Sequence, residues 1–472
     1  MRRTVRRVGC AHQSPSVERQ DGGHSPPYGC SNAPQRALPS VLRALRHRNY
    51  QLFFGGQFIS LSGTWMQTVA QSWLVYRLTG SAVLLGFIGF STQIPIFLLA
   101  PFGGSIADRY NRRRILIATQ TIAMLLAFVL AALALTGYVQ VWHVFSLAAL
   151  LGITNAFDIP ARQAFVADMV GREDLLNAIA LNSSMFNGAR MIGPALAGLL
   201  IDTVGEGWCF FINGISYFAV IVGLLLMSMT IRTPVPLPGS ALASIIEGFR
   251  YVARTGPIRA LLLLLGLVSL VGMPYTVLMP IFADQILHGG PRGLGVLMSA
   301  IGFGALAGAL TLAAKKGLHG LGHWVAFSAT GFGVSLILFS LSRSFWLSAA
   351  LLLPVGFSIM IEMASSNTLI QSLVPDALRG RVMAVYSMIF MGMAPFGSLL
   401  AGALAHNLGA PTTVVIGGII CIIGAAVFGL YLPALRREAG QIIIAQQIAG
   451  GEPPEEMTGE AGVVTPLALD RP

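Results

Sequence analysis

The chain has 472 residues, of which 54% are hydrophobic and only 10% are charged, and its formal net charge is +11. A soluble globular protein carries about a quarter charged residues, so this composition excludes an ordinary soluble domain and indicates a membrane protein. The basic residues cluster in the first segment and at the ends of apolar runs. That distribution is typical of membrane topology and gives no reason to expect a nucleic-acid partner.

Residues 1–47 are expected to form a disordered basic tail. Pro, Ser, Gly and Arg dominate this segment. No apolar stretch follows its early arginines, so we do not expect a signal peptide.

Twelve apolar segments follow, each near the roughly 20 residues that a helix needs to cross a bilayer. They lie at about 51–76, 82–104, 115–136, 141–165, 176–202, 209–230, 258–284, 293–314, 321–342, 346–373, 382–405 and 411–432. The polar stretch 231–257 ends in an amphipathic run, which predicts a cytoplasmic linker with a short interfacial helix. The sequence thus predicts an all-α membrane protein with two six-helix halves, 48–230 and 258–432, and a cytoplasmic tail at 433–472.

Positive charge is distributed unevenly over the predicted loops. With the N-terminus inside, fourteen Lys and Arg residues lie in or beside the inside loops, near 109–114, 162–172, 232–259, 315–316 and 379–381. The outside loops hold three, Arg77, Arg292 and Arg343. Because positive loops stay on the cytoplasmic side, we expect both termini in the cytoplasm and the chain in the inner membrane of a bacterium.

The loop after the second span reads Gly104-Ser-Ile-Ala-Asp108-Arg109-Tyr-Asn-Arg112-Arg113-Arg114. One carboxylate and four arginines cannot stay in hydrocarbon, so they predict a tight turn at a membrane face. The spacing resembles the loop between helices 2 and 3 of the major facilitator superfamily, with Asn111 where that pattern has its second glycine. A charge cluster that only sets topology is the alternative.

That resemblance implies a gate. Asp108 would face the start of helix 11 near Gly380, and Arg112 would meet Asp168 at the inner end of helix 4. These contacts are expected to close in the outward-open state and to stabilise it.

An internal repeat predicts two related halves. Residues 152–202 align with 356–406 at a constant offset, which pairs Asp158 with Glu362. The glycine pairs in register are Gly152–Gly356, Gly188–Gly392, Gly193–Gly397 and Gly198–Gly402. Small residues recur in helix packing, but a carboxylate at the same depth in both copies favours a true repeat. We therefore expect parallel halves related by an axis along the membrane normal, as in major facilitator proteins.

Further stretches resemble the branch of that superfamily that contains the enterobactin exporter and macrolide-efflux proteins. They are Arg48 to Gln57, Trp65-Met-Gln67, Trp73-Leu-Val-Tyr76 and Phe157-Asp-Ile-Pro-Ala-Arg-Gln-Ala-Phe165. The run Gly188-Ala-Arg-Met-Ile-Gly193-Pro194-Ala-Leu-Ala-Gly198 is similar to the Gly-Pro motif of proton-coupled antiporters, except that Ala197 replaces a glycine. A plain packing kink at Pro194 is the alternative.

No nucleotide-binding motif of the type G-x-x-x-x-G-K-[ST] occurs, so an ion gradient or the substrate gradient must drive transport. The four cysteines form no C-x-x-C pair, and neither a metal site nor a cofactor is expected. Proton coupling needs a carboxyl group within the membrane. Glu362 has no basic residue within four positions, whereas Asp158 precedes Arg162 by one turn. Glu362 is therefore the first coupling candidate and Asp158 the second; a purely structural ion pair is the alternative for both.

Polar stripes predict the lining of a substrate cavity. On the first helix, steps of three and four residues put five polar side chains on one face: Gln57, Ser60, Thr64, Gln67 and Gln71. Helix 5 adds Ser183, Asn187 and Arg190, and helices 10 and 11 add Asn367, Ser387, Met388 and Met391. Arg190 is expected either to bind an anionic substrate group or to pair with Asp158. A polar, mostly uncharged lining with adaptable methionines suits an amphipathic organic molecule.

The sequence therefore predicts a transporter and not an enzyme. The preferred hypothesis is a monomeric exporter in membrane lipid that expels amphipathic compounds of the drug or siderophore class by alternating access in exchange for protons. The alternatives are a metabolite facilitator or importer of the same fold, and a transport-like sensor or lipid flippase.

Overall fold

The computed structural model describes residues 40–228, 241–315, 317–318 and 320–450, and every regular element in this part of the chain is a helix. The elements are η1 (Ser40–Arg46), α1 (Arg48–Thr79), α2 (Ala82–Arg109), α3 (Arg112–Leu135), α4 (Val141–Val204), α5 (Glu206–Leu226), α6 (Ala241–Arg254), α7 (Gly256–Leu267), η2 (Val268–Gly272), α8 (Tyr275–Ile281), η3 (Phe282–Ile286), α9 (Gly290–Ala314), α10 (Leu321–Leu341), α11 (Phe345–Leu373), α12 (Asp376–Leu408) and α13 (Ala410–Gly450).

Ten helical segments of the described chain are long and apolar enough to cross a membrane. The predicted spans 51–76 and 176–202 are helical but are not among the ten. These two segments carry the polar stripes of the first and fifth predicted helices, and the polar side chains lower their hydropathy. Two of the helices that the sequence marks as lining a cavity are thus the ones that do not count among the ten.

α4 contains two predicted spans in one continuous element. Its 64 residues break once, at Gly171, where φ is 72° and ψ is 177°. Only glycine adopts such a positive φ without strain, so the chain changes direction there. The seventh predicted span is instead divided into α7, η2, α8 and η3, since Pro274 and Pro280 lack backbone donors and the flanking turns widen into π-helix.

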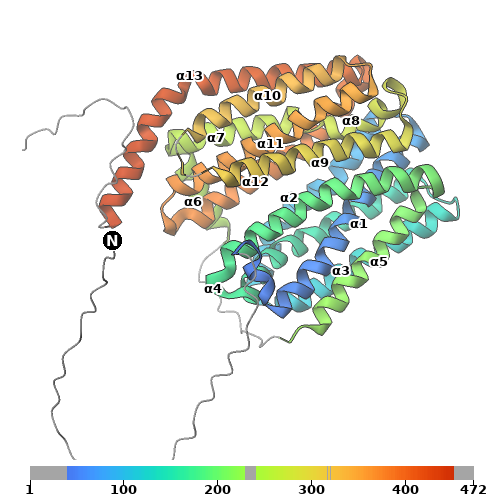
Figure 1. Ribbon diagram of the computed structural model, residues 1–472, viewed down its shortest axis with the longest axis horizontal. Helices are drawn as coiled ribbons and strands as arrows, with labels where there is room; N and C mark the ends of the chain where they lie inside the picture. Colours follow the sequence, from blue (N-terminus) through green and yellow to red (C-terminus); the bar gives the residue numbers. More distant parts are fainter. Residues whose placement is uncertain (1–39, 229–240, 316, 319, 451–472) are drawn as a thin grey trace, which may run out of the picture. The chain divides into compact units, whose positions relative to one another are not determined.

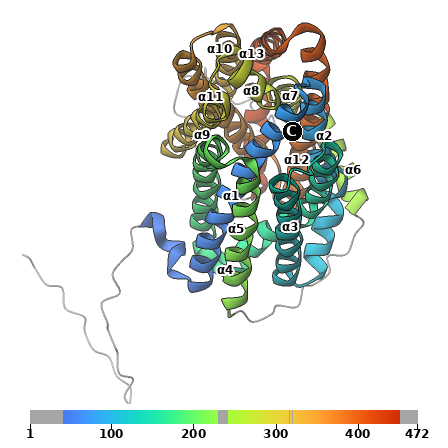
Figure 2. The same cartoon turned by 90° about the vertical axis from the view of Figure 1, so that its right-hand side faces the viewer.

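The helices pack in two groups. α1–α5 contact mainly one another, and α7–α13 do the same. Figure 1 shows the blue-to-green first group beside the yellow-to-red second group, and Figure 2 shows the same separation from another side. The most extensive contacts between the groups join α2 to α12 and α4 to α9.

Glycines permit these two close approaches. A Cβ built on Gly198 of α4 would lie 2.9 Å from Cα of Gly295 in α9, and one built on Gly402 of α12 would lie 3.0 Å from Cα of Gly86 in α2. Both contacts lie toward the helix ends that face away from the basic loop 109–114. We call the end with this loop the basic face and the other end the opposite face.

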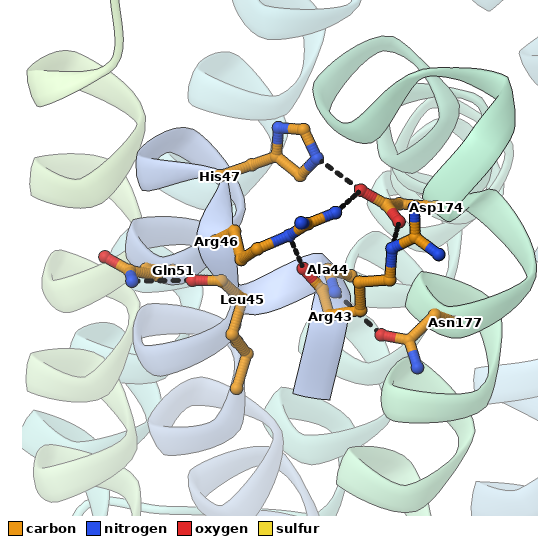
Figure 3. A network of polar contacts seen from close by, with 8 residues as sticks. All are labelled: Arg43, Ala44, Leu45, Arg46, His47, Gln51, Asp174 and Asn177. Carbon is orange, nitrogen blue, oxygen red and sulfur yellow. Dashed lines mark hydrogen bonds and ion pairs between the residues drawn. The ribbon is translucent and has the colours of Figure 1, made fainter. Parts of the chain in front are cut away.

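The segment before α1 is ordered and folds onto the turn within α4. η1 places Arg43 Nε 3.0 Å from Oδ1 of Asp174, while Arg46 Nη2 and His47 Nε2 lie 3.2 and 2.9 Å from its Oδ2 (Figure 3). Three cationic or polar groups thus converge on one buried carboxylate. The predicted disordered tail is wrong for residues 40–47, because composition alone does not reveal a distant acidic partner; residues 1–39 lie outside the described chain.

Two other predicted boundaries change. α6 is the helix expected in the linker, and it is followed directly by α7 at Gly256. The polar tail predicted from 433 begins as helix, since α13 continues through Pro433 to Gly450. Proline removes one hydrogen bond without ending the helix here, so the helix extends past the residue where the tail is expected to begin.

Candidate functional site

A polar cavity of about 170 Å³ lies among α1, α3, α4 and α5. Gln57, Ser60 and Thr64 of the α1 stripe line it, opposite Asp158 and Arg162 of α4. The remaining lining residues are Leu61, Trp65, Thr68, Thr119, Gln120, Ala123, Thr154, Asn155, Ile159, Phe186 and Tyr217. Hydroxyls, amides, aromatic rings and one carboxylate–guanidinium pair thus surround the same space.

Asp158 is buried and well supported. Its side chain is 2% exposed, and its Oδ1 accepts hydrogen bonds from Thr119 Oγ1 and Gln120 Nε2, both at 2.8 Å. Arg162 Nη2 lies 3.3 Å from the other oxygen, Oδ2, one helical turn away. Two donors and a cation thus satisfy this buried carboxyl group, so Asp158 is arranged as a structural or substrate-facing acidic group.

Glu362 occupies the repeat-equivalent position in α11 under opposite conditions. It is 1% exposed, and neither carboxylate oxygen has a hydrogen-bond partner in the described structure. The hydroxyls of Ser365 and Ser366, one turn further along, are likewise buried without a partner there. Burying an ionised carboxylate without a partner is costly, so this setting suits a carboxyl group that holds a proton.

The last two residues of the α1 stripe, Gln67 and Gln71, pack between helices instead of lining this cavity. Gln67 Oε1 accepts a 2.7 Å hydrogen bond from Nδ2 of Asn213 in α5, which is fully buried. Gln71 is 8% exposed and is also absent from the lining. Sequence reasoning missed Asn213 and Tyr217, whose hydroxyl lies 3.3 Å from Thr64 Oγ1; isolated polar residues in the apolar α5 were the available signal.

The predicted residues of the second part of α4 lie beside α1. Ser183 is exposed, and the Asn187 side chain donates a 2.9 Å hydrogen bond to the backbone carbonyl oxygen of Ser183. The Arg190 guanidinium lies 5.5 Å from the ring centre of Trp65, within range of a cation–π interaction. Arg162 occupies the position beside Asp158 that Arg190 was alternatively expected to fill.

The candidates on α11 and α12 are not part of this cavity. Asn367 accepts a hydrogen bond from Gln371 on the same helix, Ser387 is exposed, and Met388 and Met391 are half-buried. None of the four predicted residues lines the cavity near Asp158. Their assignment to a substrate pathway stays a prediction.

The Gly-Pro motif sits at the junction of three helices. A Cβ on Gly193 would lie 2.5 Å from Trp65 Cβ in α1, and one on Gly198 would meet the α9 backbone. Gly188 faces Phe58 at an ordinary 3.4 Å, and Pro194 lies between the two close contacts. The motif therefore packs α4 against α1 on one side and α9 on the other.

The turn at the basic face contains one predicted contact and lacks another. Arg112 Nη1 donates to both oxygens of Asp168, at 3.0 and 2.9 Å, which is the expected pairing. Asp108 is exposed and, among the described residues, reaches only Arg112, at 3.5 Å. A Cβ on Gly380 would find nothing within 4 Å, so the contact expected between Asp108 and the start of α12 is not formed in this conformation. The residues beside it are turned elsewhere: Arg109 is exposed, Gly104 faces open space, and Arg113 donates to carbonyls of α5.

Polar contacts join the two groups at the opposite face. Tyr76 donates a 2.7 Å hydrogen bond to Asp284, and Arg292 Nη2 lies 3.0 Å from Asp202 Oδ2. The glycine contacts of α4 with α9 and of α2 with α12 lie toward the same end. The two groups of helices are therefore in contact at the opposite face, while the contact expected at the basic face between Asp108 and the start of α12 is not formed.

A bundle of apolar helices around a polar cavity and two buried carboxylates defines a multi-pass membrane transporter. The chain belongs to the family described as transmembrane secretion effector, which matches residues 39–464, and this family lies within the major facilitator superfamily. It is thus a transporter and not an enzyme.

Its curated relatives include exporters of siderophores and drugs. The chain is 27% identical to the staphyloferrin A transporter of Staphylococcus aureus, over 78% of this chain and 93% of that protein. It is 27% identical to the multidrug efflux pump Tap of Mycolicibacterium fortuitum, over 79% of this chain and 93% of that protein. It is 26% identical to the enterobactin exporter EntS of Shigella boydii, over 82% of this chain and 91% of that protein.

Solved structures show the same fold at low identity. A transporter of the POT family in complex with a thioalcohol-conjugated peptide matches with a TM-score of 0.68 and 13% identity, over 82% of this chain and 96% of its own. A bacterial homologue of the human lysosomal transporter Spinster matches with a TM-score of 0.63 and 15% identity, over 83% and 98%. These similarities establish the fold alone.

Proposed function

We propose that this protein exports amphipathic organic compounds of the siderophore or drug class and exchanges them for protons by alternating access. The relatives with siderophore and drug names support the substrate class. The cavity, with its hydroxyls, amides and aromatic rings beside Asp158 and Arg162, suits one part of a molecule with both polar and apolar groups, since its volume of about 170 Å³ is below that of sites that enclose a whole drug-sized ligand. Such a ligand buries apolar area while a few polar groups fix its orientation.

We also propose twelve crossings in two pseudo-symmetric halves, with the basic face in the cytoplasm of a bacterial cell. Counting α4 as two crossings and α7–η3 as one gives the predicted number. Repeat-equivalent glycines have equivalent neighbours, which supports the symmetry: Gly198 meets Gly295 of α9, as Gly402 meets Gly86 of α2. Positive charge at the basic face supports the orientation.

The observation that carries proton coupling is the contrast between the two repeat-equivalent carboxylates. Asp158 has two hydrogen-bond donors and Arg162 beside it, while both oxygens of Glu362 are buried without a partner in the described chain. A carboxyl group that is costly to ionise in one conformation can release its proton when rearrangement brings water or a cation to it. Glu362 is therefore the proposed proton carrier, and Asp158 the proposed substrate-side or structural anion.

The test compares Glu362→Gln with the wild type in proteoliposomes that carry an imposed pH gradient. A fluorescent amphipathic dye and a siderophore serve as transport probes. Glu362→Gln mimics the protonated state permanently, so it is expected to keep exchange of labelled for unlabelled probe and to lose uphill transport by about tenfold or more. An uncoupler should abolish uphill transport by the wild type.

Asp158→Asn is the matched control at the equivalent site. It removes the negative charge beside Arg162 and puts an amide donor in place of one carboxylate oxygen, while the other oxygen can still accept from Thr119 and Gln120, so it is expected to reduce probe binding or folding as well as transport. Full uphill transport by Glu362→Gln would exclude Glu362 as the carrier. Failure of the wild type to move either probe while it binds them would exclude the export function itself.

A further inference from the structure

A second and larger cavity lies outside the polar cavity, as a groove between α7 and α13. Its volume is about 740 Å³, within the range of ligand sites. The two helices are neighbours in the second group (Figure 1). The proposed transport cycle uses none of its residues, and it faces outward, since Leu263 of α7 and Ile423 and Val427 of α13 are 68%, 57% and 48% exposed.

The α7 wall of the groove has the depth of one bilayer leaflet. It runs from Gly256 to Leu267, which is about 16 Å at 1.5 Å per residue. Half of a hydrocarbon core of about 30 Å is about 15 Å. Since α7 begins at the basic face, this wall matches the leaflet on that side, and the α13 wall, from Ile420 to Glu438, is longer at about 27 Å.

One end of the groove carries two opposite charges. Arg259 Nη1 donates a 3.0 Å hydrogen bond back to the carbonyl of Ala253, which leaves its other donors available. Glu438 Oε1 accepts a 3.0 Å hydrogen bond from the Gly256 N–H at the start of α7. Both charged groups therefore lie at the end of the groove where α7 begins, yet no ion pair joins Arg259 to Glu438 in the described part of the chain.

The two opposite charges of Arg259 and Glu438 favour some lipid headgroups over others. A guanidinium binds phosphate through paired hydrogen bonds, and a carboxylate accepts hydrogen bonds from a primary ammonium group. An anionic glycerol headgroup carries the same phosphate but has only hydroxyl groups and no cation to balance the charge of Glu438. A choline headgroup has no N–H to donate to it.

We propose that this groove binds one phospholipid of the basic-face leaflet, with a primary-amine headgroup of the phosphatidylethanolamine class. Arg259 binds the phosphate, Glu438 binds the ammonium group, and one acyl chain lies along the apolar walls of α7 and α13. The site is separate from the transport cavity and does not depend on which compound is transported.

The test uses the full-length protein in proteoliposomes doped with phosphatidylethanolamine, phosphatidylcholine or phosphatidylglycerol, each with a photoactivatable acyl chain. Cross-linked peptides are then mapped by mass spectrometry. Phosphatidylethanolamine is expected to label α7 and α13 peptides about tenfold more than the other two lipids, as expected for hydrogen bonds between charged groups. Equal labelling by all three would show annular lipid only, and preferred phosphatidylglycerol would show an anionic-lipid site; either result overturns the proposal.

Paired variants separate the headgroup contacts from the acyl-chain contacts. Arg259→Gln should lose most phosphatidylethanolamine labelling, while Arg437→Gln, an exposed arginine of α13 outside the groove, should not. Glu438→Gln should remove the preference over phosphatidylcholine. Val427→Trp should fill the groove and block labelling, whereas Leu430→Trp, at a side chain 80% exposed outside the lining, should leave it unchanged. Unchanged labelling in Val427→Trp would place the lipid elsewhere, and wild-type thermal unfolding would show that each variant is folded.

Discussion

Arg292 Nη2 lies 3.0 Å from Asp202 Oδ2, and this ion pair links the start of α9 to the end of α4 at the opposite face. The two side chains are 61% and 39% exposed. An exposed pair of this kind contributes at most about 1 kcal/mol. If transport proceeds by alternating access, the pair breaks each time the opposite face opens, so its weakness suits a contact that must be remade in every cycle.

Arg292→Gln is expected to increase the population open at the opposite face by up to about fivefold, the factor that corresponds to about 1 kcal/mol. Distances between spin labels at Tyr138 and Trp346, exposed at that face on the two groups, would report the shift. Arg343→Gln is the control, since Arg343 is exposed near the same face. An unchanged distance distribution in Arg292→Gln would show that the ion pair does not help to close this face.

Gly198→Val is expected to open the same face more strongly. Its added side chain would meet the backbone of α9 at about the 2.9 Å found for a Cβ, and only separation of α4 from α9 relieves that overlap. Spin-label distances should lengthen and uphill transport should fall, while the protein stays folded. Gly429→Val is the matched control, because a Cβ there has nothing within 4 Å.

Asp108→Asn is expected to reduce transport severalfold without lowering expression. Within the described chain Asp108 touches only Arg112 in the present conformation, so its loss leaves this state largely unaffected. In the alternate state it is expected to meet the positive end of α12, a contact that contributes about 0.3–1 kcal/mol. Glu173→Gln, at an exposed carboxylate of the same face outside α12, is the control. Wild-type transport by Asp108→Asn would remove this residue from the gate.

Thr64→Cys and Gln67→Cys should differ in reaction with a water-soluble thiol reagent. Thr64 lines the polar cavity, whereas the Gln67 amide is bonded to buried Asn213 between α1 and α5. We expect Thr64→Cys to be labelled and to be protected by bound substrate, and Gln67→Cys to resist labelling. Gln67→Ala should instead lower thermal stability, since it leaves Asn213 without its acceptor. Equal labelling at both positions would contradict the packing described for α1.

Asp174 gives the stability of the basic face a pH dependence. The hydrogen bond from His47, with Arg46 and Arg43 nearby, holds the pKa of Asp174 below its ordinary value of 3.8. A lowered pKa means that the contribution is fully present above the ordinary value and is lost as pH falls through the lowered one. The unfolding temperature of the wild type should therefore exceed that of Asp174→Asn at pH 7, and the difference should shrink below about pH 3.8. A difference that grows on acidification would contradict the assignment.

Local patterns in the sequence predicted local contacts well. The pairing of Asp158 with Arg162 follows from their one-turn separation on a helix. Ten of the predicted apolar segments lie in described helices that are long and apolar enough to cross a bilayer. The bond between Gln67 and Asn213 joins residues 146 positions apart, and nothing periodic relates them. The contacts of Arg43, Arg46 and His47 with Asp174 were missed for the same reason. These residues precede α1 and cannot be distinguished by composition from the rest of the basic tail.

The sequence also could not predict which conformational state the structure adopts. The spacing of the loop 104–114 predicts which residues can meet, but it does not say in which state they do. Arg112 and Asp168 pair here because both belong to the first group of helices. Asp108 needs a residue of the second group, and the position of that group depends on a global equilibrium.

The length of α13 has a consequence beyond the membrane. Its 41 residues extend over about 60 Å, whereas the hydrocarbon core is about 30 Å thick. Tilting cannot absorb a twofold excess. The last turns, where α13 bends away from the bundle (Figure 1), must therefore stand in water or lie along the headgroups. This makes them a rigid handle for an antibody fragment or fluorescent reporter that would not obstruct the helices within the bilayer.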